Sequence, residues 1–497
     1  MFGQGLSLIL AEPISIVWCF IGVIIGIIFG SIPGLTATMA IAIFLPVTYT
    51  LSAINSISLL IALFVGGISG GLISAILLNM PGTPSSVATT FDGHPMALRG
   101  EGGRALGVGI LYSFIGTLIG TTALIFIAPL LANIALKFGP YEYFSVMILA
   151  LTLIISLASE NMVKGLISGV IGLIIGTVGM DPIVGVQRFT FGNLGLKSGF
   201  GTLTVLVGLY AITEVLITGE NIVKVEDKNI TNFKMKGLGI TFAEFKQQFW
   251  NMIRSSAIGT FIGILPGIGG ATSNMISYTA AKSNAKDGDT YGKGNIGGLV
   301  ASEAANNATI GGALIPLLTL GIPGDTTTAM LLGGFMLQGM IPGPLIFETN
   351  GAEMYALFIF LIISSFMMLV LQYFGIRGFV KVLSIPSNLL MPAIVSLCAI
   401  GAFGLNSRTF DISAMFVFGL LGYAMVKTNI PRQPLVLGFV LGSLLETNLR
   451  RGLTMSLNSF IPFITSPISG MFLVLSVLSL AYGIYKYIKK RKPVMAE

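Results

Sequence analysis

The residues best suited to binding a ligand follow proline-glycine pairs that interrupt apolar runs. Four such pairs occur, at Pro33-Gly34, Pro81-Gly82, Pro266-Gly267 and Pro323-Gly324. A break inside a membrane helix frees backbone carbonyl groups on one side and N–H groups on the other. The carbonyl groups can coordinate a cation, and the N–H groups at the start of the next helix can bind an anion. Each break is therefore a candidate site for an anion, a cation or both.

Small hydroxyl residues follow the breaks and strengthen this interpretation. Ser and Thr are N-cap residue types whose hydroxyls can bind a carboxylate alongside backbone N–H groups. Simple helix capping is the alternative, and the same atoms can serve both roles. From the breaks and from an asparagine pair discussed next, the sequence predicts that a substrate contacts Pro33, Gly34, Thr36, Asn79, Pro81, Gly82, Thr83, Ser85, Pro266, Gly267, Asn306, Asn307, Pro323, Gly324, Thr326 and Thr327.

The candidate ion ligands are Asp325, Glu303, Thr38 and Thr272. Helical spacing places Asn306 and Asn307 three and four residues after Glu303 and on its face. A carboxylate inside a membrane segment is a functional candidate by default. The alternative is that Glu303 lies near the membrane surface and is merely solvated. Apart from a possible sodium ion, no metal or cofactor is expected, and no residue is assigned a catalytic role.

The breaks recur in order along the chain. Gly26-x-x-x-Gly30-x-x-Pro33-Gly34 returns as Gly259-x-x-x-Gly263-x-x-Pro266-Gly267, and residues 68–86 return as residues 310–328. Proline-glycine pairs usually mark ordinary loops, but these four are flanked by apolar runs and repeat in register. A chain whose two halves break their helices at matching points is typical of a secondary transporter.

Composition indicates a polytopic membrane protein. Of 497 residues, 54% are hydrophobic and 9% are charged, which is too apolar for a water-soluble fold. We expect an all-α protein in the lipid bilayer with roughly ten to twelve membrane helices, some re-entrant. The net charge of +7 sits in short loops and does not indicate nucleic acid. No phosphate-binding loop, nucleophile elbow or zinc-protease motif occurs, so the sequence does not predict an enzyme.

The distribution of Lys and Arg predicts topology. None occurs before Arg99, whereas residues 219–254 contain six, and the C-terminal tail is basic. We expect the chain to lie in the cytoplasmic (inner) membrane. By the positive-inside rule, its N-terminus is on the outer side and its C-terminus is on the cytoplasmic side. Basic residues also exchange places between equivalent loops of the two halves, which predicts inverted repeats. The expected divisions are repeat 1 (1–218), a cytoplasmic linker (219–254), inverted repeat 2 (255–452) and a terminal helix with a basic tail (453–497).

Asp92 and His94 precede Arg99, Glu101 and Arg104 in a segment rich in turn residues. We expect a cytoplasmic loop there. His94 is the only histidine, and a proton-shuttle role is the alternative to an incidental loop residue.

Ordered motifs over nearly the whole chain resemble the large membrane subunit of the tripartite tricarboxylate transporters. They are Asn79-Met80-Pro81-Gly82-Thr83-Pro84, Asp92-Gly93-His94-Pro95-Met96-Ala97, Gly100-Glu101-Gly102-Gly103-Arg104-Ala105-Leu106-Gly107, Glu303 with Asn306-Asn307, Gly311-Gly312-Ala313-Leu314-Ile315-Pro316, Gly321-Ile322-Pro323-Gly324, Phe418-Gly419-Leu420-Leu421-Gly422-Tyr423 and Leu444-Leu445-Glu446-Thr447-Asn448-Leu449-Arg450-Arg451.

This resemblance implies cation-coupled uptake, by sodium or proton, of a small di- or tricarboxylate. It also implies an extracytoplasmic solute-binding protein and a small multi-helix membrane subunit as partners, with substrate and ion sites at the four breaks. The chain departs from the usual pattern at Asp325, where a small neutral residue is common, and at Ser302 and Ser74, where proline is usual. An extra carboxylate would repel an ionised tricarboxylate, so we hypothesise that Asp325 is a cation ligand or is protonated and that citrate is not the substrate.

Three other functions remain open from the sequence. A stand-alone secondary organic-anion transporter would need no binding protein. A channel would conduct without coupling. A structural membrane scaffold would leave the paired breaks unexplained.

Overall fold

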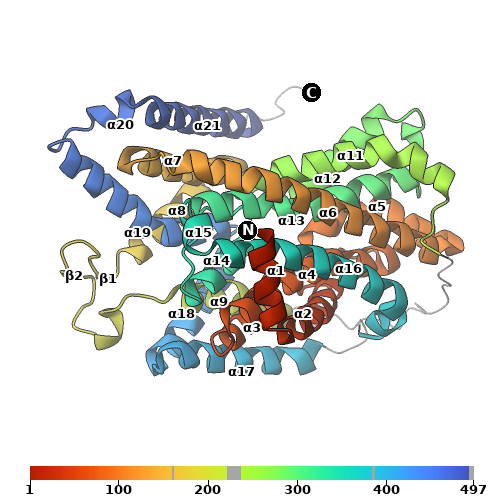
Figure 1. Cartoon of the computed structure of the whole chain (residues 1–497), viewed down its shortest axis with the longest axis horizontal. Coiled ribbons are helices and arrows are strands. Elements are labelled where there is room, and N and C mark those ends of the chain that lie inside the picture. The colour runs from red at the N-terminus through yellow and green to blue at the C-terminus, as the bar shows by residue number, and fades with distance from the viewer. Residues whose placement is uncertain (159–161, 221–236, 383–386, 492–497) are drawn as a thin grey trace. The chain divides into compact units, whose positions relative to one another are not determined.

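The computed structural model describes residues 1–158, 162–220, 237–382 and 387–491. The linker residues Lys224, Lys228, Lys234 and Lys236 lie outside these ranges. The described residues are mostly helical, apart from one short antiparallel pair of strands, β1 (Gly179–Met180) and β2 (Gln187–Arg188) (Figure 1). Seven of the described helices are long and apolar enough to cross a membrane. The predicted all-α polytopic membrane fold is confirmed.

The chain forms two compact units that each combine segments from both halves of the sequence. Unit 1 contains residues 1–132 and 214–401, and unit 2 contains residues 133–213 and 402–497. The predicted repeat boundaries describe duplication along the chain and stay a prediction. One helix, α11 (Phe242–Ile264), begins inside the segment predicted as linker.

The first repeat opens with a helical hairpin in unit 1. The helix α2 (Ile14–Ser31) packs against α4 (Ala53–Leu78) in the same direction, because Gly22, Gly26 and Gly30 lie successively against the carbonyl groups of Leu59, Leu63 and Gly67. Such close approach is possible because glycine has no Cβ. Between them α3 (Ala37–Thr48) must run back, since its last residue, Thr48, accepts a hydrogen bond from Ser56 near the start of α4. We call α2 and α3 hairpin 1.

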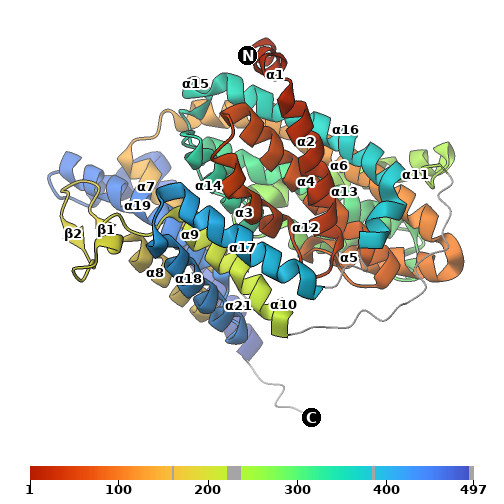
Figure 2. The same cartoon turned by 90° about the horizontal axis from the view of Figure 1, so that it is seen from below.

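The second repeat has the same arrangement. The helix α11 runs parallel to α13 (Ile296–Leu320), with Gly259 against the Ala305 carbonyl and Gly312 against the Thr260 carbonyl. The intervening α12 (Gly269–Asn284) returns along α13, and Ser277 donates to the Ala301 carbonyl at 3.0 Å. We call α11 and α12 hairpin 2. In Figures 1 and 2 hairpin 1 is red and hairpin 2 is green.

A second kind of break follows α4 and α13. Each of these helices ends in a left-handed residue, Asn79 (φ 58°) and Gly321 (φ 71°), which are the residue types that adopt this conformation most readily. The chain then folds back along the helix it has just left, so that Gly82 lies against Gly71 and Gly324 against Ala313. The next helices begin there: η1 (Pro84–Ser86) continuing into α5 (Val87–Met96), and α14 (Thr326–Leu337).

Corresponding ends of the two repeats contact each other within unit 1. Gln338, at the end of α14, donates to the Thr48 carbonyl at 2.6 Å, which places the end of repeat 2 beside the base of hairpin 1. Asp92, near the end of α5, accepts from the Gly292, Gly294 and Asn295 N–H groups at the base of hairpin 2. The same relationship holds in both directions, as a two-fold axis requires. These contacts are reciprocal, and the inverted orientation of the repeats stays a prediction.

The remaining helices complete the two units. In unit 2, α8 (Met162–Gly176) packs closely on α19 (Arg432–Met455), with Gly172 against the Leu435 carbonyl and Gly438 against the Gly169 carbonyl. The other helices are α1 (Phe2–Ala11), α6 (Gly102–Ala135), α7 (Pro140–Leu153), α9 (Thr202–Val207), α10 (Thr213–Glu220), α15 (Ile346–Thr349), α16 (Gly351–Val382), α17 (Ser387–Asn406), α18 (Thr409–Lys427), α20 (Ile461–Thr465) and α21 (Pro467–Arg491).

Candidate functional site

The tip of hairpin 1 meets the break before α14. The hydroxyl oxygen of Thr38 lies 2.8 Å from that of Thr327 and 3.1 Å from that of Thr326. Thr38 follows the Pro33-Gly34 break, and the two other threonines follow the Pro323-Gly324 break. A break in the first repeat is therefore hydrogen-bonded to a break in the second.

The tip of hairpin 2 makes the corresponding contact with η1. A Cβ placed on Gly270 would lie 2.9 Å from Ser85 Cβ and 3.1 Å from the Asn306 Oδ1 atom. Each tip also touches the break of its own repeat. The Gly267 N–H donates to the Gly324 carbonyl at 2.7 Å, and a Cβ on Gly82 would lie 2.2 Å from the Gly30 carbonyl oxygen. All four breaks consequently come together in unit 1.

Several helices begin at this meeting point. They are α3, α12, α14 and the η1–α5 segment. A helix N-terminus carries partial positive charge and unpaired N–H groups, so a cluster of them attracts an anion. No Lys or Arg occurs between residues 1 and 98, 255 and 281, or 294 and 376. An anion here would therefore depend on backbone N–H groups, hydroxyls and amides.

The hydroxyl and carboxyl residues after the breaks cap these helices. Thr36 accepts from the Met39 N–H at 3.1 Å. The Asp325 Oδ1 atom accepts from the Thr328 N–H at 2.7 Å and from the Thr328 hydroxyl at 2.8 Å. Thr83 accepts from the Ser86 hydroxyl through its backbone carbonyl. The capping interpretation is confirmed for Thr36 and Asp325, and a ligand role for the same atoms stays a prediction.

Asn306 is a buried polar residue at the site whose amide has no partner among the described residues. It is 1% exposed, and neither its Nδ2 nor its Oδ1 atom has a hydrogen-bond partner among the described residues. The Asn307 Oδ1 atom is also buried without a partner. A buried unsatisfied polar group costs about 1 to 3 kcal/mol, and such groups are rare in native proteins. An amide held in this state beside Gly270 and Ser85 is suited to receive a ligand.

Glu303 lies one turn before Asn306 and is completely buried. Its Oε1 atom accepts from the Thr89 hydroxyl on α5, and its Oε2 atom accepts from the Ser113 hydroxyl on α6 at 2.8 Å. Asn307 Nδ2 donates to the same Oε2 atom at 3.3 Å and to the Ser113 oxygen at 3.0 Å. The alternative that Glu303 is a solvated surface residue is wrong.

Other predicted site residues differ in their placement. Gly82, Thr83, Ser85, Pro266, Gly267, Pro323 and Gly324 are buried at the meeting point, while Pro33 and Thr36 are half-buried and Gly34 and Pro81 are exposed. Asn79 is exposed and caps α4, and Thr272 is on the exposed side of α12. The roles predicted for Asn79 and Thr272 stay predictions.

The prediction of a loop at Asp92 and His94 is wrong. Both residues belong to α5, and Asp92 is fully buried. Its Oδ1 atom receives three backbone N–H donors at 2.7 to 2.9 Å, and its Oδ2 atom receives the Tyr278 hydroxyl at 2.8 Å. These distant donors stabilise a helix that local propensity disfavours. The His94 ring is held at 3.0 Å from the Ile76 carbonyl.

Three residues that the sequence did not single out support the site. Thr89 and Ser113 bind Glu303, and Asn274 joins α5 to α13 by accepting from the Ala88 N–H at 2.7 Å and donating to the Ser302 carbonyl at 3.1 Å. Each is a common polar residue type outside the proline-glycine breaks. No local signal distinguishes it, because its partner lies on a different helix.

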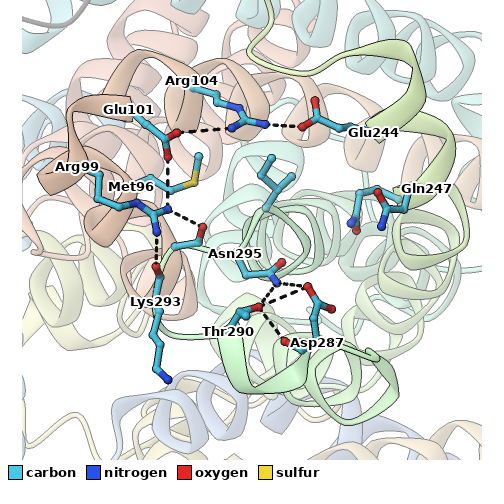
Figure 3. Close-up of a pocket in the computed structure, with 13 residues that line it drawn as sticks. Met96, Arg99, Glu101, Arg104, Glu244, Gln247, Asp287, Thr290, Lys293 and Asn295 are labelled. Carbon is cyan, nitrogen blue, oxygen red and sulfur yellow. Dashed lines mark hydrogen bonds and ion pairs between the residues drawn. The ribbon is translucent and has the colours of Figure 1, made fainter.

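A cavity of about 650 Å³ lies at the base of hairpin 2 and is lined by charged residues (Figure 3). Both of its arginines are paired with carboxylates. Arg104 pairs with Glu244 and lies 3.6 Å from Glu101, and Arg99 lies 3.3 Å from Glu101. Hydrogen bonding from the Thr241 N–H, with the nearby Arg104, lowers the pKa of Glu244. Because these cations already have carboxylate partners, this cavity is less suited to a carboxylate than the meeting point of the breaks.

The chain is similar to a known protein family and to two proteins of one bacterium. The model of the tripartite tricarboxylate transporter TctA family matches residues 16–437. A 52.8 kDa protein in the TAR-I ttuC' 3' region of Agrobacterium vitis is 37% identical over 486 residues, which covers 98% of this chain and 96% of that protein. A protein in the TAR-II ttuC' 3' region of the same organism is 37% identical over 240 residues, covering 48% of this chain and 99% of that protein. No solved structure gives a significant match.

Proposed function

This chain belongs to the tripartite tricarboxylate transporter TctA family, and on that premise we propose that it is the permease subunit for cation-coupled uptake of a di- or tricarboxylate. Membership of this family points to transport rather than catalysis. We propose that the substrate is held where the four breaks meet and that access to it alternates between the two sides of the membrane.

The observation that carries this proposal is the unpartnered amide of Asn306 among converging helix N-termini. The amide offers both a donor and an acceptor, Ser85 adds a hydroxyl, and the first turns of α12 and α14 add N–H groups. These groups match the oxygens of a carboxylate without requiring a basic residue. A fixed positive charge would hold the anion more tightly and slow its release.

Asp325 bears on which carboxylate is transported. It is half-buried at the N-terminus of α14 and only one of its oxygens is needed for the cap. We propose that its second oxygen contributes to binding a cation that accompanies the substrate. An uncompensated negative charge would disfavour a fully ionised tricarboxylate, so we propose a dicarboxylate or a partly protonated substrate instead of citrate.

The family description supports further proposals about partners and location. We propose that an extracytoplasmic solute-binding protein delivers the substrate and that a small multi-helix membrane subunit completes the complex. We place the chain in the cytoplasmic (inner) membrane with its N-terminus outside and its C-terminus inside, on the basis of the Lys and Arg distribution.

Reconstituted transport tests the proposal. The purified chain, with and without its companion subunits, is placed in liposomes and offered radiolabelled citrate, malate, succinate and glutarate. We expect uptake that depends on the binding protein and on a cation gradient, together with counterflow exchange. Equal uptake without a binding protein would indicate a stand-alone transporter, and flux without counterflow would indicate a channel.

A further inference from the structure

Glu303 is a buried acid whose partners are all neutral. Thr89, Ser113 and Asn307 contact its two carboxyl oxygens, and no cationic side chain does so among the described residues. An isolated carboxylate is costly to bury, whereas a neutral carboxylic acid is not. The three neutral donors offset only part of that cost.

The helices packed around Glu303 do not bring a charge to it. The elements α4, α5, α6, α11, α12 and α14 surround this part of α13. On them, Asp92 is bound to Tyr278 and to the base of hairpin 2, Arg104 pairs with Glu244, and Arg254 donates to Asn251. The remaining titratable groups on these elements are His94, Tyr112, Lys246, Lys282 and Asp325, and none of them contacts the Glu303 carboxyl group in the described structure.

The partners of Glu303 suit a proton better than a sodium ion. A hard cation needs several oxygen ligands directed at one point, but the Asn307 Nδ2 group donates to both the Glu303 carboxyl group and the Ser113 oxygen. That nitrogen cannot be a cation ligand. Hydroxyl groups both donate and accept. Thr89 and Ser113 can therefore donate to the ionised form of Glu303 and accept from its protonated form.

Two one-turn links connect Glu303 to the proposed substrate site. On α13, Asn306 follows Glu303 by three residues. On the η1–α5 segment, Ser85 precedes Thr89 by four residues, and Thr89 binds Glu303. Residues three or four apart share one helix face. A substrate that binds Ser85 and Asn306 would therefore contact both elements that position the Glu303 carboxyl group, α13 and the η1–α5 segment.

Resting on the proposed function, we propose that Glu303 carries the coupling proton of this transporter. It takes up a proton from one side of the membrane when substrate binds and releases it on the other side after the substrate leaves. Asn307, Thr89 and Ser113 are positioning residues that hold the carboxyl group in both states.

Calorimetry on the purified protein tests this inference. The binding enthalpy of succinate or malate is measured in buffers of different ionisation enthalpy. The slope of the binding enthalpy against the buffer ionisation enthalpy gives the number of protons taken up. We expect about one proton per carboxylate bound by the native protein and none by Glu303→Gln, because glutamine cannot titrate. Glu348→Gln, an exposed glutamate on α15, is the matched control and should behave as the native protein.

Liposome uptake gives a second readout. A pH gradient at equal sodium should drive uptake by the native protein and not by Glu303→Gln. If that variant does not fold, Ser113→Ala keeps the carboxyl group and removes one donor, so the pH at which proton uptake is half-maximal should rise.

A native protein that binds a carboxylate without proton uptake, or that follows a sodium gradient alone, would overturn the proton assignment and leave the proposed function intact. Absence of any binding or uptake with the full complex would instead overturn the proposed function itself.

Discussion

The Thr38 hydroxyl lies 2.8 Å from the Thr327 hydroxyl and joins the tip of hairpin 1 to the first turn of α14. Both side chains are buried. Thr38→Val should leave Thr327 without this partner, at a cost of about 1 to 3 kcal/mol, whereas Thr38→Ser keeps the hydroxyl. We expect a lower melting temperature and weaker carboxylate binding for the valine variant only. Identical behaviour of the two variants would show that this hydrogen bond between the repeats does not matter.

Asn306 and its neighbour Asn307 should respond oppositely to replacement by leucine. Asn306 has two buried atoms without partners, whereas Asn307 donates to Glu303 and Ser113. Removing unpaired polar atoms is neutral or stabilising, and removing a bonded one costs about 1 to 3 kcal/mol. Thermal unfolding in detergent should therefore show Asn306→Leu at or above the native melting temperature and Asn307→Leu below it.

Uptake completes the test of Asn306. If its amide contacts the substrate, Asn306→Leu should lose transport while remaining folded. A variant that is destabilised yet transports normally would move the substrate site elsewhere.

Gly82 should not tolerate a side chain. A Cβ there would lie 2.2 Å from the Gly30 carbonyl oxygen and 2.6 Å from the Ser74 hydroxyl oxygen, so Gly82→Ala should destabilise the protein by about 1 to 3 kcal/mol. Gly378→Ala is the matched control on α16, since its Cβ would meet no atom within 4 Å. That control should be neutral or stabilising by up to about 1 kcal/mol. Equal melting temperatures for the two variants would contradict the close contact.

Asp325→Asn separates capping from cation binding. Asparagine caps a helix about as well as aspartate, so α14 should remain folded. If Asp325 is a cation ligand or carries a proton, uptake measured across a pH and sodium series should change its dependence on one of these ions. Uptake that matches the native protein throughout the series would reject both roles.

Asp181, in the loop between α8 and α9, should make the stability of unit 2 sensitive to acid. Hydrogen bonds from the Val184 and Ile183 N–H groups, together with Arg450, hold the pKa of Asp181 below its usual range. A lowered folded pKa stabilises the folded state above the unfolded pKa of about 3.9, and this contribution is lost as the pH falls towards the folded pKa. The native melting temperature should therefore fall between about pH 5 and pH 2.

Asp181→Asn should remove that dependence. The variant is expected to have a lower melting temperature than the native protein near neutral pH. Its melting temperature should also fall less on acidification. Asp289→Asn, an exposed position at the base of hairpin 2, is the control and should follow the native curve. A native-like pH profile for Asp181→Asn would contradict the assigned role.

The order of the breaks was predictable because each is a local event. Proline cannot donate a backbone hydrogen bond, and glycine adopts backbone conformations that other residues rarely adopt. A proline-glycine pair inside an apolar run, such as Pro33-Gly34 or Pro266-Gly267, therefore predicts a broken helix. The exchange of basic residues between equivalent loops predicted the inversion, because charge distribution sets orientation in a membrane.

The loop at Asp92 was mispredicted for the opposite reason. Its turn-forming neighbours suggest a loop, but the donors that bind its carboxylate lie 186 to 203 residues away, at Tyr278, Gly292, Gly294 and Asn295. Propensity is a weak prior that tertiary contacts override.

By itself, the sequence determined a duplicated, membrane-embedded helical chain with breaks at matching positions, since hydropathy and proline-glycine chemistry act over a few neighbouring residues. Only the tertiary structure decided that hairpin tips meet breaks of both repeats, that Asn306 is left without partners and that Glu303 is bound by Thr89 and Ser113. Those relationships depend on which helices pack together, and helix packing is set by contacts between residues far apart in the chain.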